Sequence, residues 1–183
     1  VLHWGGARDK HSGAREYHRH EPEGLAFHRC LTPLSARMLT CTLTDRNGKP
    51  FALDQYRGQP VVLIFYLGKG CTHCMEQLNA FDPLAAEFEK KGITLLAVST
   101  DTTQGLRDTF IGYDAKDRHF NFPLLSDPTL ETFRKYRAYD DFEQTPLHGT
   151  FLIDPAGRVR WQEISYEPFM APKFLLEEST RLL

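Results

Sequence analysis

The sequence predicts an α/β fold in which a central mixed sheet is flanked by helices and preceded by an N-terminal β-hairpin. Two predominantly apolar runs, residues 60–67 and 93–100, are typical of strands that are covered on both faces. The segment between them carries apolar residues at helical spacing. A strand, a helix and a second strand form a right-handed crossover, so the two strands are expected to be parallel.

The first predicted element is a β-hairpin within residues 38–53. Cys41 and Leu43 alternate with threonines, as in a half-buried strand. Asn47-Gly48 is a strong signal for a two-residue hairpin turn. On the apolar face of this strand, Cys41 is interpreted as a small buried hydrophobe.

The crossover segment is predicted to be a helix that ends at Gly92 after two lysines, because cations favour a helix C-terminus. Pro83 lies inside it and cannot donate to the carbonyl one turn earlier, so a kink is expected there. A further helix is predicted to begin near Thr102. The apolar positions of the crossover helix are Leu78, Phe81, Ala85 and Phe88.

The second half of the chain is predicted to complete the sheet. Residues 122–136 are expected to form a short strand and a helix, with Asp127 as the cap and Pro128 at the first helical position. Residues 149–165 are predicted to be a hairpin around Asp-Pro-Ala-Gly, and residues 172–183 a final amphipathic helix. The antiparallel hairpin would thus join a parallel core.

The composition suits one globular domain with a sizeable core, since 41% of the 183 residues are apolar and 25% are charged. The net charge of −2 does not indicate the basic surface that binding to nucleic acid requires. No apolar run approaches the roughly 18 residues of a membrane span. The chain starts at Val1 without a signal-peptide pattern, which is typical of a mature form or a domain of a longer chain, and the sequence predicts no localisation.

Residues 1–35 are predicted to be an irregular extension of the domain formed by residues 36–183. The extension holds five of the eight histidines and few aliphatic residues. A polar surface segment is the preferred interpretation, because nothing else there supplies a rigid frame for metal ligands. The alternative is a metal site at His18, His20, His28 and Cys30.

Cys71 and Cys74 stand where the buried strand meets the crossover helix. In a first helical turn this spacing puts the two Cα atoms roughly 5 Å apart, which a disulfide allows. Free N–H groups and a partial positive charge at the helix start stabilise a thiolate, and a protonated His73 adds to this effect. Gly68 and Gly70 are expected to keep the approach open to the backbone of a partner. These features favour an exposed, exchangeable dithiol.

A zinc half-site and two inert cysteines are the other interpretations of the pair. Zinc needs four ligands, and the chain has no second Cys-x-x-Cys. Inert cysteines seldom occur as such a pair at a strand-to-helix turn. Redox chemistry is therefore preferred, and no cofactor or resident metal is expected.

From about residue 36 to its end, the chain resembles the thioredoxin-fold redoxins, the group shared by peroxiredoxins (the alkyl-hydroperoxide-reductase/thiol-specific-antioxidant family) and by thiol-disulfide oxidoreductases. The resemblance implies a thioredoxin fold. The stretches that carry it follow one another in the order of that fold, and they are FALDQYRGQPVVLIFYLGKGCTHC, GITLLAVSTD, FPLLSDPTLETFRKYRAY and GTFLIDPAGRV.

The resemblance divides at the site. Peroxiredoxins carry Pro-x-x-x-Thr-x-x-Cys and a distant Arg; here Cys74 falls on the reactive cysteine, while Leu67, Cys71 and His148 occupy the proline, threonine and arginine slots. Thiol-disulfide oxidoreductases share the Cys-x-x-Cys, but the slot of their cis-proline also falls at His148, and Pro146 lies two residues too early. The Sco copper chaperones use a distant histidine and two cysteines spaced one residue wider.

The sequence therefore predicts a thiol-dependent oxidoreductase that exchanges a Cys71–Cys74 disulfide with protein or small-molecule thiols, with Cys71 attacking and Cys74 resolving. One alternative is a peroxidase in which Cys74 attacks peroxide and Cys71 resolves the sulfenic acid. A second is a Sco-like copper-binding module that uses Cys71, Cys74 and His148. A third is a domain whose main role is to sit beside a larger partner chain.

Two further features stay open at this level. His148 either hydrogen-bonds a backbone carbonyl at a strand end, or lies within reach of a thiol, where a pKa of about 6.5 suits proton transfer. Residues 138–146 form an acidic, aromatic segment that either rims the site or is solvated. The solvated interpretation is preferred.

Overall fold

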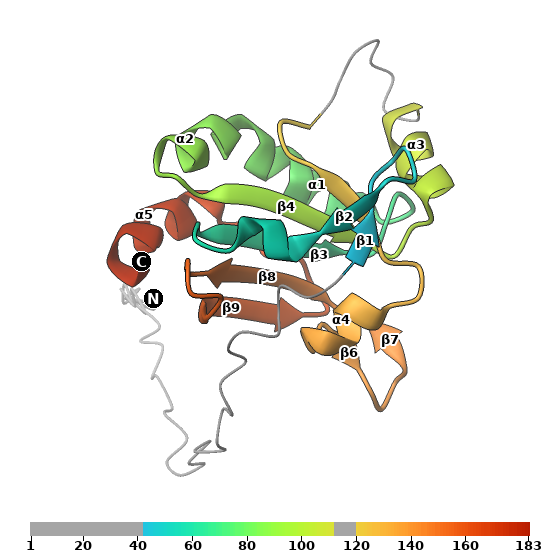
Figure 1. The fold of residues 1–183 in the computed structure, drawn as a ribbon. Coiled ribbons are helices and arrows are strands. Elements are labelled where there is room, and N and C mark those ends of the chain that lie inside the picture. Colours follow the sequence, from blue (N-terminus) through green and yellow to red (C-terminus); the bar gives the residue numbers. More distant parts are fainter. Residues whose placement is uncertain (1–41, 112–119) are drawn as a thin grey trace, which may run out of the picture. The chain divides into compact units, whose positions relative to one another are not determined.

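A mixed seven-stranded sheet forms the centre of the computed structural model, which describes residues 42–111 and 120–183. The strand order is β2-β1-β5-β4-β3-β8-β9 (Figure 1). Strands β3, β4 and β5 are mutually parallel, and the outer pairs are antiparallel, as predicted. The strands are β1 (Thr42–Thr44), β2 (Pro50–Ala52), β3 (Val61–Tyr66), β4 (Thr94–Ser99), β5 (Leu124–Ser126), β8 (His148–Ile153) and β9 (Val159–Ser165).

Helices cover both faces of this sheet (Figure 1). One face packs against α1 (Thr72–Phe81), α2 (Ala85–Lys90), α3 (Thr103–Ile111) and α5 (Pro172–Leu182). The other face packs against α4 (Glu131–Lys135) and the 3₁₀ turn η1 (Leu53–Tyr56). The predicted positions of the helices near Thr102 and in residues 172–183 are thereby confirmed.

Strand β3 is the centre of the core. All six of its residues are buried, and alternate side chains enter the two opposite hydrophobic clusters. Ile64 and Tyr66 face α1, whereas Leu63 and Phe65 face α4. The prediction of a strand covered on both faces is confirmed, and its C-terminal end delivers the chain to the first turn of α1.

The predicted break at Pro83 is present. Helix α1 ends at Phe81, a 3₁₀ turn η2 (Asp82–Leu84) follows, and α2 continues to Lys90. Gly92 adopts the left-handed conformation that terminates α2 (φ +72°). The helix that carries the cysteines is consequently short and separate from α2.

The β1–β2 hairpin exists, but the prediction of a two-residue turn was wrong. Asp45 N–H donates to the carbonyl of Lys49, so three residues lie inside this pair, and Gly48 takes the left-handed position (φ +78°). The Asp45 carboxylate also accepts the N–H groups of Asn47 and Lys49, both at 2.8 Å. These side-chain bonds stabilise the wider loop.

The β8–β9 hairpin agrees with the prediction. Asp154 Oδ1 accepts the N–H groups of Ala156 and Arg158 and thereby fixes the turn between the two strands. The pairing continues to the start of β8, where His148 lies opposite Ser165. This register determines which carbonyl of the chain lies beside His148.

The segment 138–146 is more ordered than a solvated loop. It forms a small antiparallel pair, β6 (Tyr139–Asp140) and β7 (Thr145–Pro146), that the sequence did not indicate. Its tip agrees with the preferred interpretation, because the Phe142 side chain is 89% exposed. The Tyr166 hydroxyl donates to the Asp140 carboxylate and so joins this hairpin to the chain after β9.

Several sequence predictions fall outside the described residues. They include the extension at 1–35, its possible metal ligands and the buried position of Cys41, all of which stay predictions. Within residues 42–111 and 120–183, no helix has both the length and the apolar character that crossing a membrane requires.

The start of α4 differs from its prediction. Residues 127–130 form a turn closed by the bond from Leu130 N–H to the Asp127 carbonyl, so Pro128 precedes the helix by three residues. Asp127 still caps α4 from this distance, since its Oδ2 accepts the N–H groups of Thr132 (2.8 Å) and Phe133 (3.1 Å).

Replacing Asp127 with Ala is expected to destabilise the domain by about 1–2 kcal/mol, because two helix N–H groups in a buried position lose their acceptor. Glu131→Ala is the matched control, since Glu131 is an exposed acid in the same first turn. Urea unfolding of both variants measures the difference. Equal losses of stability would contradict the capping role of Asp127.

Candidate redox site

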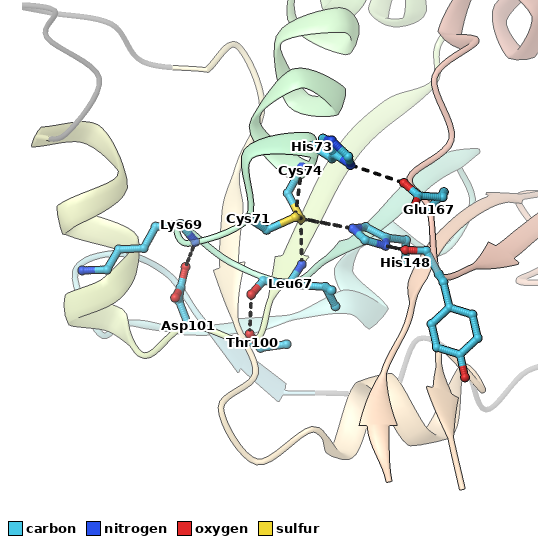
Figure 2. The surroundings of a disulfide bond; sticks show 10 residues. Leu67, Lys69, Cys71, His73, Cys74, Thr100, Asp101, His148 and Glu167 are labelled. Atoms are coloured by element: carbon cyan, nitrogen blue, oxygen red, sulfur yellow. Dashed lines mark hydrogen bonds and ion pairs between the residues drawn. A yellow bond between two sulfur atoms is a disulfide. The ribbon is translucent and has the colours of Figure 1, made fainter. Parts of the chain in front are cut away.

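Cys71 and Cys74 form a disulfide at the N-terminus of α1, where Cys71 is the N-cap residue (Figure 2). Their Cα atoms are 5.2 Å apart, close to the predicted spacing. Cys74 N–H donates to Cys71 Sγ over 3.2 Å, so the outer sulfur satisfies one of the free amides of the helix start. Cys71 is half-buried, whereas Cys74 is 0% exposed.

The loop between β3 and α1 is fixed by the segment after β4. Lys69 N–H donates to Asp101 Oδ2 over 2.8 Å, and Thr100 Oγ1 donates to the Leu67 carbonyl over 2.9 Å (Figure 2). Gly68 is buried and left-handed (φ +99°), and a Cβ there would lie 2.7 Å from Asp101 Oδ1. The expectation for Gly68 was therefore wrong: it makes room for Asp101 rather than for a partner. Gly70 is exposed, and a Cβ added there would have no atom within 4 Å.

His148 lies against the cysteine pair. As the first residue of β8 it stands beside the end of β3, because these strands are antiparallel and Phe65 pairs with Gly149. Its Nε2 is 3.1 Å from Cys74 Sγ and 3.8 Å from Cys71 Sγ. Its Nδ1 is 2.9 Å from the Tyr166 carbonyl oxygen. Both interpretations of His148 therefore hold at once, one for each ring nitrogen.

The carbonyl of Tyr166 determines the tautomer of the neutral ring. A carbonyl oxygen only accepts, so Nδ1 carries the proton and donates to it. Nε2 is then unprotonated and presents its lone pair to the sulfurs. In this tautomer His148 can accept a proton from a thiol that is formed when the disulfide is reduced.

Burial keeps His148 neutral in the disulfide form. Desolvation lowers the pKa of the imidazole below its usual 6.5, and the nearby His73 acts in the same direction. The Tyr166 carbonyl and the carboxylate of Glu167 oppose this shift, but burial is the larger effect. Near pH 7 the ring is therefore neutral, and its Nε2 lone pair is free of a proton.

His73 points away from the disulfide. Its side chain is 63% exposed, and Nδ1 lies 3.3 Å from Glu167 Oε2 (Figure 2). A charge on His73 would be screened by solvent and balanced by this carboxylate. Its predicted effect on the thiolate stays a prediction and would act across solvent rather than by contact.

Sequence reasoning missed the main-chain groups of the site. The Leu67 N–H donates to Cys74 Sγ over 3.3 Å, and the Tyr166 carbonyl orients His148. Glu167, which pairs with His73, was also not singled out. The register of β9 against β8 places the Tyr166 carbonyl and Glu167 beside the site. No side-chain pattern in the sequence encodes that register.

The three residues of the copper-binding alternative lie together. One sulfur from each of Cys71 and Cys74 and a ring nitrogen of His148 lie within 4.8 Å of one another. A disulfide offers no thiolate to a metal, so this alternative concerns the reduced chain. It stays a prediction.

Comparison with known families decides the family. Residues 35–162 match the AhpC/TSA family, which is more than half of the chain. The chain belongs to the AhpC/TSA family. Membership confirms the predicted resemblance to thioredoxin-fold redoxins and supports the prediction of a thiol-dependent oxidoreductase.

Two curated peroxiredoxins are similar in sequence to this AhpC/TSA chain. A putative peroxiredoxin of the rubredoxin operon in Clostridium pasteurianum is 36% identical over 115 residues, which are 61% of this chain and 64% of the relative. The chloroplastic peroxiredoxin Q of Sedum lineare is 28% identical over 143 residues, 78% of this chain and 73% of the relative.

A solved structure confirms the fold. Peroxiredoxin Q of Xanthomonas campestris superposes with a TM-score of 0.66 and 23% identity, covering 79% of this chain and 92% of that one. At this identity the similarity establishes the fold, a thioredoxin fold with a central mixed sheet.

The neutral state of His148 predicts a pH dependence of the oxidised protein. Because folding lowers the pKa of this ring, the unfolded chain binds the proton more readily. Stability contributed by the neutral ring should be complete above about pH 6.5 and be lost as the pH falls through the lower pKa of the folded state. Urea unfolding between pH 8 and pH 5 measures this loss.

His148→Gln is the matched variant for this test, since glutamine does not titrate. The difference in stability between wild type and variant should shrink as the pH falls below 6.5. Nitrogen NMR of the wild-type ring should also show the proton on Nδ1 at pH 7. A pH-independent difference would contradict the lowered pKa of His148, and a proton on Nε2 would contradict the inferred tautomer.

Proposed function

We propose that this chain is a thiol-disulfide oxidoreductase that exchanges its Cys71–Cys74 disulfide with thiols of a protein or of a small molecule. The observation that carries the proposal is the unequal placement of the two sulfurs. The Cys71 sulfur belongs to a half-buried residue at the N-cap of α1, and the Cys74 sulfur is buried against His148. An outer sulfur that is attacked and an inner sulfur that leaves are what the exchange needs.

The first step is attack by an incoming thiolate on Cys71 Sγ. A new S–S bond forms between the thiol and Cys71, the Cys71–Cys74 bond breaks, and its electron pair goes to Cys74 Sγ. A second thiolate of the substrate then attacks the substrate sulfur of the mixed disulfide and releases Cys71 as a thiolate. The substrate leaves as a disulfide, having lost two electrons, and the chain holds a reduced pair. All steps are reversible.

In the reverse direction Cys74 resolves the mixed disulfide. Its thiol must first lose a proton, and His148 Nε2 at 3.1 Å is the acceptor. The resulting thiolate attacks Cys71 Sγ and expels the substrate thiol. In this role His148, the first residue of β8, acts as a general base that the carbonyl of Tyr166 orients.

Helix α1 supports the outer sulfur. Once Cys71 is a thiolate, the Cys74 N–H at 3.2 Å and the partial positive charge at the start of the ten-residue helix stabilise it. A lower pKa of Cys71 makes it a nucleophile near neutral pH and also a good leaving group. Both properties favour rapid exchange.

Peroxide reduction is the second candidate, and the comparisons favour it. The relatives named above are peroxiredoxins. The sequence resemblance to that family also implies that Cys74 falls on its reactive cysteine. Cys74 would attack the peroxide oxygen to form a sulfenic acid and an alcohol or water. The Cys71 thiolate would then displace hydroxide from that sulfur and form the observed disulfide. Thiols would reduce it again by the exchange described above.

Serine variants of the two cysteines separate these activities. If exchange dominates, Cys71→Ser should abolish reduction of insulin disulfides, because the accessible nucleophile is lost. Cys74→Ser should retain a nucleophile at position 71 and accumulate a mixed disulfide with its substrate, because nothing resolves it. Insulin turbidity with dithiothreitol and mass mapping of the trapped adduct provide the two measurements.

The same variants assayed for hydrogen peroxide consumption test the second candidate. Rapid single-turnover consumption that survives Cys71→Ser but not Cys74→Ser would make peroxide reduction the activity and overturn the leading proposal. Cys41→Ser serves as the matched control, since it removes a thiol outside the pair. Consumption by neither variant nor wild type, together with active insulin reduction, supports exchange alone.

A further inference from the structure

We infer that the main-chain N–H of Leu67 stabilises the sulfur of Cys74 as it leaves the disulfide as a thiolate. The inference rests on the proposed exchange and adds a group to it that no side chain supplies. Leu67 N lies 3.3 Å from Cys74 Sγ and donates to it (Figure 2). The donor therefore touches the leaving sulfur, one of the three sulfurs that react.

The position of this amide follows from the fold. Strand β3 ends at Tyr66, so the Leu67 N–H lies just beyond the strand and turns toward the start of α1. The Thr100 hydroxyl holds the carbonyl of the same residue at 2.9 Å. The next peptides are fixed by the left-handed Gly68 and by the Lys69 N–H bond to Asp101. The donor is thus already oriented before the disulfide opens.

The buried sulfur needs such a donor. Negative charge develops on Cys74 Sγ when the incoming thiolate attacks Cys71, and a fully buried thiolate is unfavourable without hydrogen bonds. In the disulfide form His148 presents an unprotonated Nε2, so the ring can donate to this sulfur only after it has itself taken up a proton. Within the described residues, Cys74 Sγ has two polar contacts, His148 Nε2 and the Leu67 N–H. While the ring is neutral, only the Leu67 N–H donates to the sulfur.

The N–H of Leu67 changes neither the atoms nor the electrons that the exchange transfers. The S–S bond breaks, its electron pair moves to Cys74 Sγ, and the new bond forms between the substrate sulfur and Cys71 Sγ. The Leu67 N–H transfers no proton; it strengthens from a contact with a neutral sulfur to a charge-assisted hydrogen bond. It acts in the way that an oxyanion-hole amide acts on an oxygen.

The identity of residue 67 then matters in one respect. Every amino acid except proline has this N–H. The sequence resemblance to peroxiredoxins implies that they have proline in the slot of Leu67. A proline there has no N–H, so this chain has a donor that the peroxiredoxin pattern lacks. Tyr66 is extended, which is the conformation that a following proline requires. Leu67→Pro is therefore a conservative way to remove one donor.

The test compares Leu67→Pro with Leu67→Ala. Both variants lose the leucine side chain, which packs partly against the two hydrophobic clusters, but only proline removes the N–H. Loss of a hydrogen bond to a charged group should raise the pKa of the Cys74 thiol by about one to two units. Because a poorer leaving thiol departs more slowly, dithiothreitol should reduce the proline variant about fivefold more slowly than the alanine variant.

The thiol pKa provides the discriminating readout. In a Cys71→Ser background, thiolate absorbance should show a higher pKa of Cys74 in the Leu67→Pro variant than in the Leu67→Ala variant. In a Cys74→Ser background, the pKa of Cys71 should be the same in both, because its sulfur takes the N–H of residue 74 instead. Each titration is corrected by the Cys71→Ser/Cys74→Ser protein. Equal reduction rates and equal Cys74 pKa values would overturn the inference.

A measurement without a variant at position 67 covers the case in which the proline variant does not fold. In the reduced protein, the amide proton resonance of Leu67 should move downfield as Cys74 ionises, while that of Lys69, held by Asp101, stays in place. An unmoved Leu67 resonance would overturn the inference. None of these assays uses a protein substrate, so failure of the proposed exchange activity would leave their outcomes readable.

Discussion

The antiparallel pairing of β8 with β3 is the interaction on which the redox site depends. It brings His148 to Cys74 across 74 residues of sequence, because the first residue of β8 arrives beside the end of β3. The pairing leaves no room for a side chain at Gly149, where a Cβ would lie 2.8 Å from the ring of Phe151. That ring is part of the cluster that packs under α4. Core packing on one face of the sheet thus positions the base on its other side.

Two opposing effects meet at the inner sulfur. Burial of Cys74 excludes water and disfavours a thiolate, whereas the helix start and the Leu67 amide favour one, and the facing imidazole can take up the thiol proton. Since Cys71 lies at the N-cap and is only half-buried, the same helix start supports it with less loss of hydration. The disulfide therefore joins two sulfurs in unequal environments. This inequality favours attack on the Cys71 sulfur and departure of the Cys74 sulfur.

Much of the fold could be predicted because apolar periodicity records it directly. The buried strands, the break at Pro83 and the position of the cysteine pair all follow from side-chain types along the chain. Failures occurred where one side chain rearranged a turn, as Asp45 does in the first hairpin and Asp127 before α4. The main-chain groups of the site could not be predicted, because a carbonyl or an amide is common to nearly every residue and only the tertiary register selects it.

The tautomer of His148 depends on an acceptor that belongs to the main chain, and this has a consequence for how the protein can diverge. Exchanging the Tyr166 side chain for another leaves the carbonyl in place, so a substitution at this position does not change the hydrogen bond that sets the tautomer of His148. An insertion or deletion in the turn at residues 154–158 is different. A shift of one residue in the register would exchange the faces of β9 and bring another peptide group opposite His148. The length of that turn, rather than the identity of residue 166, is therefore what inheritance must preserve.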